Sequence, residues 1–184
     1  MNDPARLLDE TRRELGRLVP LLEAQVGDLD AQSARARPAP GEWAPIEILC
    51  HLRDEEREDF GARLRVVLDG GSGFAPIAPE RWVEERRYRD ADLALTLRDL
   101  RARRGESLAF LTTVSAARLA ASVPHARLGA LSGLDLLAAW VAHDRLHLAQ
   151  LANTLTRLWA DRWMPLKAEY GGPLPYPPST GACQ

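Results

Sequence analysis

Apolar residues recur at intervals of three and four along four stretches of the chain, at residues 3–26, 44–69, 91–118 and 132–162. This spacing places the apolar side chains on one face of an α-helix. Strand signals are almost absent, because β-branched residues are few and do not alternate with polar ones. The sequence therefore predicts an all-α protein with four long amphipathic helices.

Local signals mark where these helices begin and where they are interrupted. Asp3 followed by Pro4 is an N-cap with proline at the first helical position. Ser132 and Asp135 have the spacing of a capping box with a shorter acid. Pro20 lies inside the first apolar repeat, and we expect it to kink or divide that helix, because proline lacks the backbone N–H that a helix interior uses.

Four amphipathic helices of this length predict a four-helix bundle. The connection between the second and third helices, about residues 70–90, is long enough to cross from one end of the bundle to the other. Simple up-down order is therefore not required. We expect residues 1–163 to form one bundle domain, and residues 164–184, rich in Pro and Gly, to wrap the surface or fray.

Composition narrows the classes of protein that fit. The chain has 184 residues and a formal net charge of −2, so a nucleic-acid binder would need a local basic patch to overcome the balance. No apolar run approaches the length of a membrane span, and the N-terminus lacks the apolar core of a signal peptide. A disulfide between Cys50 and Cys183 is not expected, which favours a cytoplasmic protein.

Three of the four histidines form a pattern that suits a metal ion. His143 and His147 are four residues apart in the fourth predicted helix, so their imidazoles share a face, on one flank of its apolar stripe. His51 lies on a flank of the second helix. Packing the two flanks together would create a three-histidine site with an open position, the pattern of a catalytic rather than a structural metal site. The alternative is that these are hydrogen-bonded core histidines, since spacing alone is weak support.

Residues near these histidines allow a functional and a structural interpretation. Glu55, one turn beyond His51, could orient an imidazole or act as a catalytic base, although a solvated surface glutamate is the favoured interpretation. Asp144 points away from His143 and is expected to pair with an arginine. Trp43 is expected to be a packing anchor at the helix entrance, and Cys50 a buried small hydrophobe.

Two segments of the chain resemble signatures of a known family. Residues 38–52 read PAPGEWAPIEILCHL, and residues 143–151 read HDRLHLAQL. Together they resemble the two signatures of the DinB superfamily, the DinB/YfiT-like metalloenzymes, and the likeness extends over roughly residues 4–162. The second signature is a His-x-x-x-His pair followed by Gln.

The resemblance implies several properties. It implies a bundle with up-down-down-up order and a divalent metal, zinc or nickel, held by His51, His143 and His147. Gln150 matches a family position and is expected to hydrogen-bond near the site or between helices. Some relatives are thiol-dependent transferases or isomerases and others are called hydrolases, which implies a small-molecule substrate. Many are dimers, so a homodimer is expected, with neither nucleic acid nor membrane as a partner.

The long connection gains a possible role from this resemblance. Trp82, Arg86, Arg87 and Tyr88 could line the mouth of the site and bind an anionic thiol cofactor. They could equally be ordinary packing and solvated charge.

The leading hypothesis is a cytoplasmic metalloenzyme that activates water or a low-molecular-weight thiol, as a hydrolase or a thiol transferase. Its metal binding is expected to weaken around pH 6, as the imidazoles protonate. The alternative is a non-catalytic metal-binding or stress-response binding module.

Overall fold

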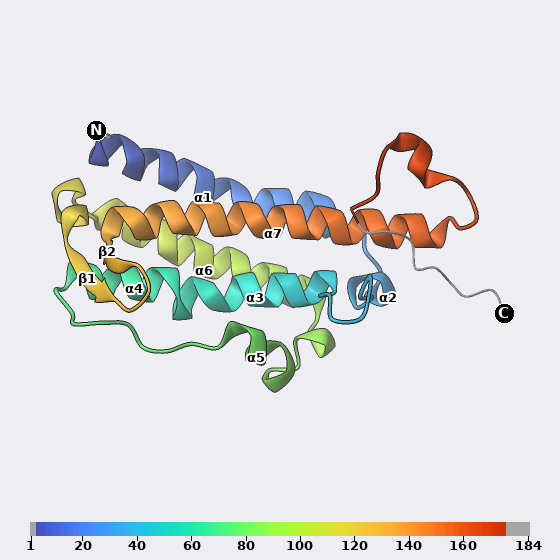
Figure 1. The fold of residues 1–184 in the computed structure, drawn as a ribbon, viewed down its shortest axis with the longest axis horizontal. Helices are drawn as coiled ribbons and strands as arrows, with labels where there is room; N and C mark the ends of the chain where they lie inside the picture. The colour runs from blue at the N-terminus through green and yellow to red at the C-terminus, as the bar shows by residue number, and fades with distance from the viewer. Residues whose placement is uncertain (1–2, 176–184) are drawn as a thin grey trace.

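Four helical stretches pack side by side into an elongated bundle (Figure 1). The structure is a computed structural model that describes residues 3–175, so the prediction for the end of the tail and for Cys183 lies outside the described residues. The stretches are α1 (Pro4–Val26), α3 with α4 (Pro45–Glu58 and Phe60–Leu68), α6 (Leu93–Thr113) and α7 (Gly133–Arg162). A short helix, α2 (Ala31–Ala34), lies in the first connection.

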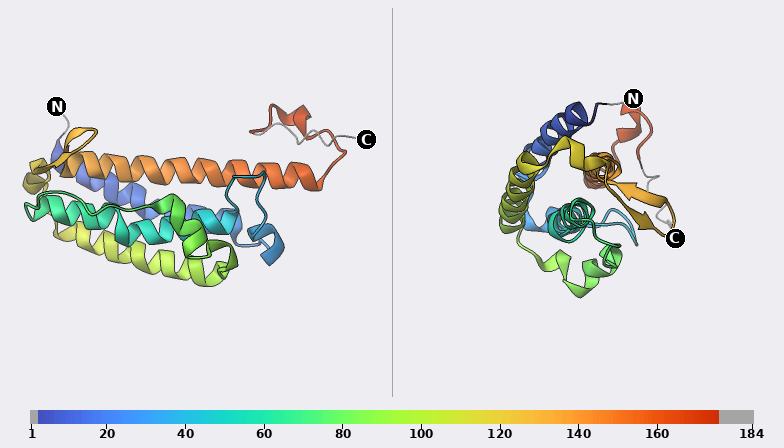
Figure 2. Two further views of the ribbon diagram at one scale, coloured as in Figure 1. Left: turned by 60° about the horizontal axis from the view of Figure 1, so that its bottom comes forward. Right: turned by 90° about the vertical axis from the view of Figure 1, so that its left-hand side faces the viewer.

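The chain runs through the bundle in the order up, down, down, up (Figures 1 and 2). The connection after α4 passes back along the bundle, so that α6 runs in the same direction as α3 and α4. It contains α5 (Pro79–Glu85) and a 3₁₀ turn, η1 (Tyr88–Asp90), both packed on α3. The predicted four-helix bundle with its crossover is therefore confirmed. Among the described residues, no helix combines the length and apolarity needed to cross a membrane.

The predicted division of the first helix at Pro20 is wrong, and an unpredicted division occurs in the second helix. α1 continues through Pro20, since Val19 and Leu22 on either side of it are buried in the core and hold the helix in place. The second helix instead divides at Asp59, whose backbone (φ −117°, ψ −99°) is not helical. The third helix ends at Thr113 and is followed by a 3₁₀ turn, η2 (Ala116–Ala120).

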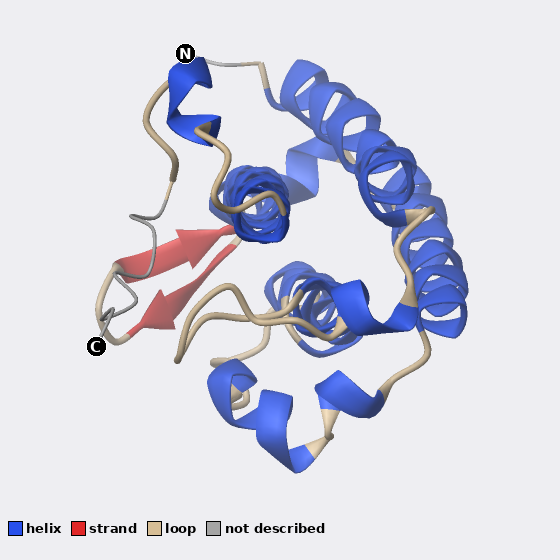
Figure 3. Ribbon diagram, turned by 90° about the vertical axis from the view of Figure 1, so that its right-hand side faces the viewer, coloured by secondary structure: helices blue, strands red, loops and turns tan. Residues whose placement is uncertain are grey.

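A small β-hairpin precedes α7, which the sequence did not predict. Strands β1 (Ser122–His125) and β2 (Gly129–Ser132) pair antiparallel and stand out from the bundle (Figure 3). The half-buried His125 stabilises the turn, because its Nδ1 accepts hydrogen bonds from the backbone N–H groups of Arg127 and Leu128. The hairpin ends at the predicted capping box, where the Ser132 and Asp135 side chains bond each other's backbone N–H.

Within the described residues, the core contains three apolar clusters, of which one joins α3 to the crossover. Buried ions separate the other two. On each of the four helical stretches, the residues of one of these two clusters precede those of the other along the helix. Arg104 lies in the gap between them and pairs there with both Glu56 and Asp144. Burial raises the pKa of both carboxyls, because an apolar interior disfavours their charged forms.

Candidate metal centre

The seam between α3 and α7 brings His51, His143 and His147 to one point. The Nε2 atom of His51 lies 3.3 Å from Nε2 of His143 and 3.0 Å from Nε2 of His147. The Nε2 atoms of His143 and His147 are 3.1 Å apart. Two helices thus supply three nitrogen atoms that face a common centre, as the spacing of the histidines predicted.

The size of this triangle suits a divalent ion. A tetrahedral ion with metal–nitrogen bonds of about 2.0–2.1 Å separates its ligand nitrogens by about 3.3–3.4 Å. The observed separations of 3.0–3.3 Å need only a small expansion to reach that value. Three nitrogens on one side leave further coordination positions on the other. The group therefore has the donor set of an open, catalytic type of metal site.

Gln150 fixes which nitrogen of His147 is available. Its Oε1 lies 2.7 Å from Nδ1 of His147 and accepts the Nδ1 proton, so Nε2 carries a free lone pair directed at the centre. The side chain of Gln150 is thus placed next to the site, on the same helix, one turn beyond the histidine that it orients.

Replacing Gln150 by alanine should lower the affinity for a divalent metal by about 10- to 100-fold, because His147 loses the partner that selects its tautomer and orientation. Competition with a chromophoric chelator measures the change. Asn153→Ala is a matched control, since Asn153 is exposed on the same helix one turn further on. If the Gln150→Ala and Asn153→Ala variants bound the metal with equal affinity, Gln150 would not have this orienting role.

Burial keeps the imidazoles of His51 and His147 neutral. It lowers the pKa of His51 to about 3 and that of His147 to about 4, and the charge of a protonated His143 lowers both further. Neutral imidazole is the form that binds metal, so both side chains are ready to act as ligands at neutral pH. The sequence predicts that the ligands protonate around pH 6. For His51 and His147 the structure corrects this expectation to a lower pH range.

The free energy of unfolding of the metal-free protein is expected to fall as the pH drops from about 6.5 towards 4. In this window the unfolded chain takes up protons on His51 and His147, whereas the folded protein does not, so acid favours unfolding. Each group contributes a slope of about 1.4 kcal/mol per pH unit. Urea unfolding at several pH values measures it. A His51→Gln, His147→Gln double variant with the same slope as the wild type would contradict the assignment.

Glu55 is a part of the centre, and its interpretation as a solvated surface residue is wrong. Its side chain is 6% exposed, because α6, α7 and the crossover cover α3 on several sides. Its Oε2 lies 2.8 Å from Nε2 of His143, and its Oε1 lies 3.6 Å from Nε2 of His51. Within the described residues, Oε2 makes no hydrogen bond. A buried carboxylate oxygen that faces the nitrogen of one imidazole and lies next to two more suits a site that binds a cation.

Aromatic rings close two sides of the centre. The Trp43 ring is 4.9 Å from the ring of His51 and lies parallel to that of His147 at 6.2 Å, so it packs on the ligands themselves and not only at the helix entrance. The Phe60 ring is 5.0 Å from His143. The His143 side chain is still 20% exposed, compared with 5% for His51, so the centre is accessible from the α7 side.

Cys50, expected to be a buried small hydrophobe, and Arg86, a candidate for the mouth of the site, form their hydrogen bonds and ion pairs away from the three histidines. Cys50 is buried, and its Sγ is 3.7 Å from the hydroxyl of Thr96. Arg86, in the crossover, forms ion pairs with Asp54 and Glu58. These contacts fit the interpretation of the crossover as packing and paired charge.

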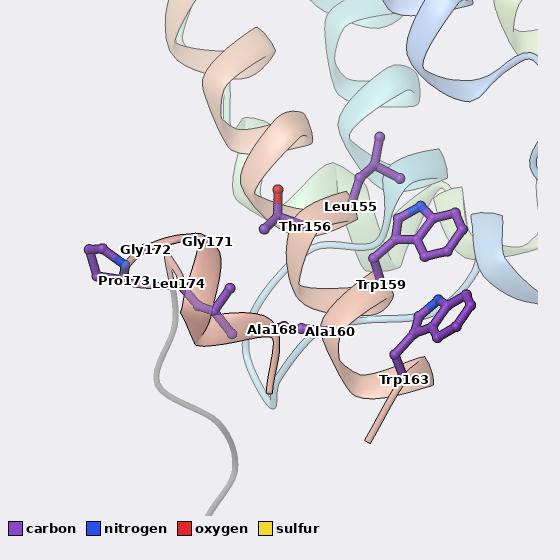
Figure 4. Close-up of a pocket in the computed structure, with 10 residues that line it drawn as sticks. All are labelled: Leu155, Thr156, Trp159, Ala160, Trp163, Ala168, Gly171, Gly172, Pro173 and Leu174. Atoms are coloured by element: carbon purple, nitrogen blue, oxygen red, sulfur yellow. The ribbon is translucent and has the colours of Figure 1, made fainter. Parts of the chain in front are cut away.

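A cavity of about 570 Å³ lies near the other end of α7, beyond the histidines (Figure 4). Its walls come from the last turns of α7 and from the segment that follows, and they include Leu155, Trp159, Trp163 and Leu174. None of the three histidines lines this cavity, so it is separate from the candidate metal centre.

Comparisons with known proteins identify a family and a shared fold. The family model of the DinB superfamily matches residues 8–151. YfiT from Bacillus subtilis, described as a probable metal-dependent hydrolase with an unusual four-helix bundle topology, has a TM-score of 0.74 at 19% identity, covering 83% of this chain and 87% of that one. TT2238, a four-helix bundle protein, has a TM-score of 0.57 at 22% identity, covering 79% and 98%. At these identities the two structures show a shared fold. No curated protein matches the sequence.

Proposed function

Because the chain belongs to the DinB superfamily, we propose that it is a metal-dependent enzyme in which His51, His143 and His147 hold one divalent ion that activates water or a low-molecular-weight thiol. The observation that supports this most strongly is the convergence of three Nε2 atoms on one point with an accessible side. Zinc and nickel are the ions we propose, since imidazole nitrogen suits both.

Three neutral imidazoles leave the full charge on such an ion, which lowers the pKa of a coordinated water to about 7 or stabilises a coordinated thiolate. Glu55 is placed to take the proton that the nucleophile loses, because its Oε2 lies 2.8 Å from a ligand nitrogen and is free to accept. Trp43 and Phe60 keep bulk water away on two sides. The substrate enters from the exposed side of His143.

Assays on the metal-loaded protein distinguish hydrolysis from thiol transfer. The metal-loaded protein is assayed with activated esters in water, and with an electrophile in the presence of glutathione, bacillithiol or mycothiol. We expect a rate in one of these assays that the metal-loaded protein has and His147→Ala lacks. Equal rates for the two proteins in every assay would contradict the catalytic role.

A non-catalytic metal-binding module is the second candidate. The feature that favours it is the deep burial of His51 and Glu55, with the Trp43 ring packed on His51, which suits a site that retains its ion. Exchange of the bound ion with added isotope separates the two candidates. Fast exchange and inhibition by small metal-binding anions are expected of an open, catalytic centre.

A further inference from the structure

Four helical stretches meet at a group of buried ions next to the candidate metal centre. Arg104 of α6 donates two hydrogen bonds to Asp144 of α7, at 2.6 and 3.1 Å, and also pairs with Glu56 of α3. It donates a further bond of 2.9 Å to the carbonyl of Leu15 in α1. We call Arg104, Glu56 and Asp144 the buried ion group.

Two residues of this group directly follow residues of the metal centre in the chain. Glu56 follows Glu55 in α3, and Asp144 follows His143 in α7. Neighbouring residues on a helix point about 100° apart. On each of these two helices, one side chain therefore faces the histidine centre and the next one faces the ion group.

The charges of the two sites do not cancel. As whole residues, Glu55, Glu56, Asp144 and Arg104 are each 3–5% exposed. In their ionised forms, three carboxylates and one guanidinium carry an excess of two negative charges, in a region where water screens them little. A cation in the centre favours these ionised forms, which burial alone disfavours. The neighbouring carboxylates are not in excess, since three partly exposed arginines (Arg53, Arg86 and Arg103) surround Asp54, and Arg63 pairs with Asp59.

We infer that the buried ion group sets the charge of the metal centre, so that Glu56, Asp144 and Arg104 together with Glu55 supply the two negative charges that one divalent cation neutralises. Under this inference Glu56 and Asp144 act at a distance, without touching the ion. This inference rests on the proposed metal centre and gives a reason why that centre would prefer a doubly charged ion.

A purely structural role explains the group less well. Buried ion pairs contribute little net stability, and apolar side chains of similar size often hold helices together as well or better. An uncompensated buried charge costs more still. A group that carries excess negative charge beside three imidazoles is therefore better explained by a cation that occupies the centre.

The test compares charge removal with hydrogen-bond removal at the same carboxylate. Glu56→Gln removes one negative charge and keeps the shape of the side chain. Ser107→Ala removes the hydroxyl that donates a 2.8 Å hydrogen bond to Glu56 and leaves the charge. Glu58→Gln removes a more exposed charge two residues away, which is a matched control. Zinc affinity is measured for each full-length protein by competition with a chromophoric chelator, and metal-free thermal unfolding is recorded in parallel.

We expect Glu56→Gln to bind zinc about 10- to 100-fold more weakly than the wild type, and Ser107→Ala and Glu58→Gln to bind it within about three-fold of the wild type. An unchanged affinity in Glu56→Gln, or an equal loss in Ser107→Ala, would overturn the inference. If Glu56→Gln does not fold, Arg104→Lys decides, since it keeps the charge and loses the forked geometry. A wild-type zinc affinity in Arg104→Lys supports the inference, and a ten-fold loss overturns it. A wild-type protein that binds no zinc or nickel would instead refute the proposed function.

Discussion

Replacement of His143 by alanine is expected to lower the affinity for a divalent metal by at least about 100-fold, which exceeds the usual effect of losing a residue that only orients a ligand. The reason is geometric. Nε2 of His143 lies within 3.3 Å of the other two ligand nitrogens, and its side chain is 20% exposed, so its loss leaves two ligands and a gap on the open side. Elemental analysis of protein purified without added metal measures the loss.

Leu146→Ala is the matched control for this experiment. Leu146 lies between the two histidines of α7, and its side chain points to solvent, so its removal should leave the metal content unchanged. If the His143 variant retained as much metal as the wild type and the Leu146 variant, the candidate centre would be misassigned.

The second large effect is expected from Glu55→Gln. The change removes the base that is placed beside the ligands and keeps the size of the side chain, so the turnover number should fall by about 10²- to 10⁴-fold at saturating metal. Metal affinity should weaken by a smaller factor, because Glu55 also supplies one of the buried negative charges. Steady-state kinetics on the active substrate and a metal titration separate the two effects.

Glu55→Asp provides a second point, since it keeps the carboxylate and draws it back by one methylene. We expect partial activity from it, between those of the wild type and of Glu55→Gln. A Glu55→Gln protein with the wild-type turnover number would exclude this residue as a base and would leave it a role in charge alone.

The helices and the grouping of the histidines could be predicted because both depend on local sequence. Helical periodicity, the Asp3 cap and the Ser132–Asp135 box are read within a few residues. A spacing of four residues fixes His143 and His147 on one face of any helix. The position of His51 opposite them followed from the flank on which it lies only if the two flanks pack together, and the family resemblance strengthened that inference, since the packing of two helices is not a local property.

The features that the sequence did not predict depend on contacts between distant segments. Pro20 is accommodated because the core residues around it hold α1 in place, and propensity alone cannot show this. Glu55 is buried because other elements cover α3, whereas its own helix predicts only a polar face. The strands of the hairpin are only four residues each, and β1 contains Pro124, so neither shows the alternation that identifies a strand.

The buried ion group illustrates the same limit. Asp144 was expected to pair with an arginine, and the partner is Arg104, forty residues away in the chain. A charged residue in line with the buried Leu100 and Leu111 of α6 was the available signal for Arg104. The sequence carried no signal that Glu56 joins this pair, because that contact follows only from the packing of α3 against α6 and α7.

X-ray absorption of the protein loaded with zinc tests the central claim most directly, that three histidines of this chain hold one divalent ion. The account predicts one ion per chain, with the scattering of three imidazole rings at metal–nitrogen distances of about 2.0–2.1 Å and the remaining positions filled by oxygen ligands. A spectrum with no imidazole scattering, or with sulfur as a ligand, would contradict it.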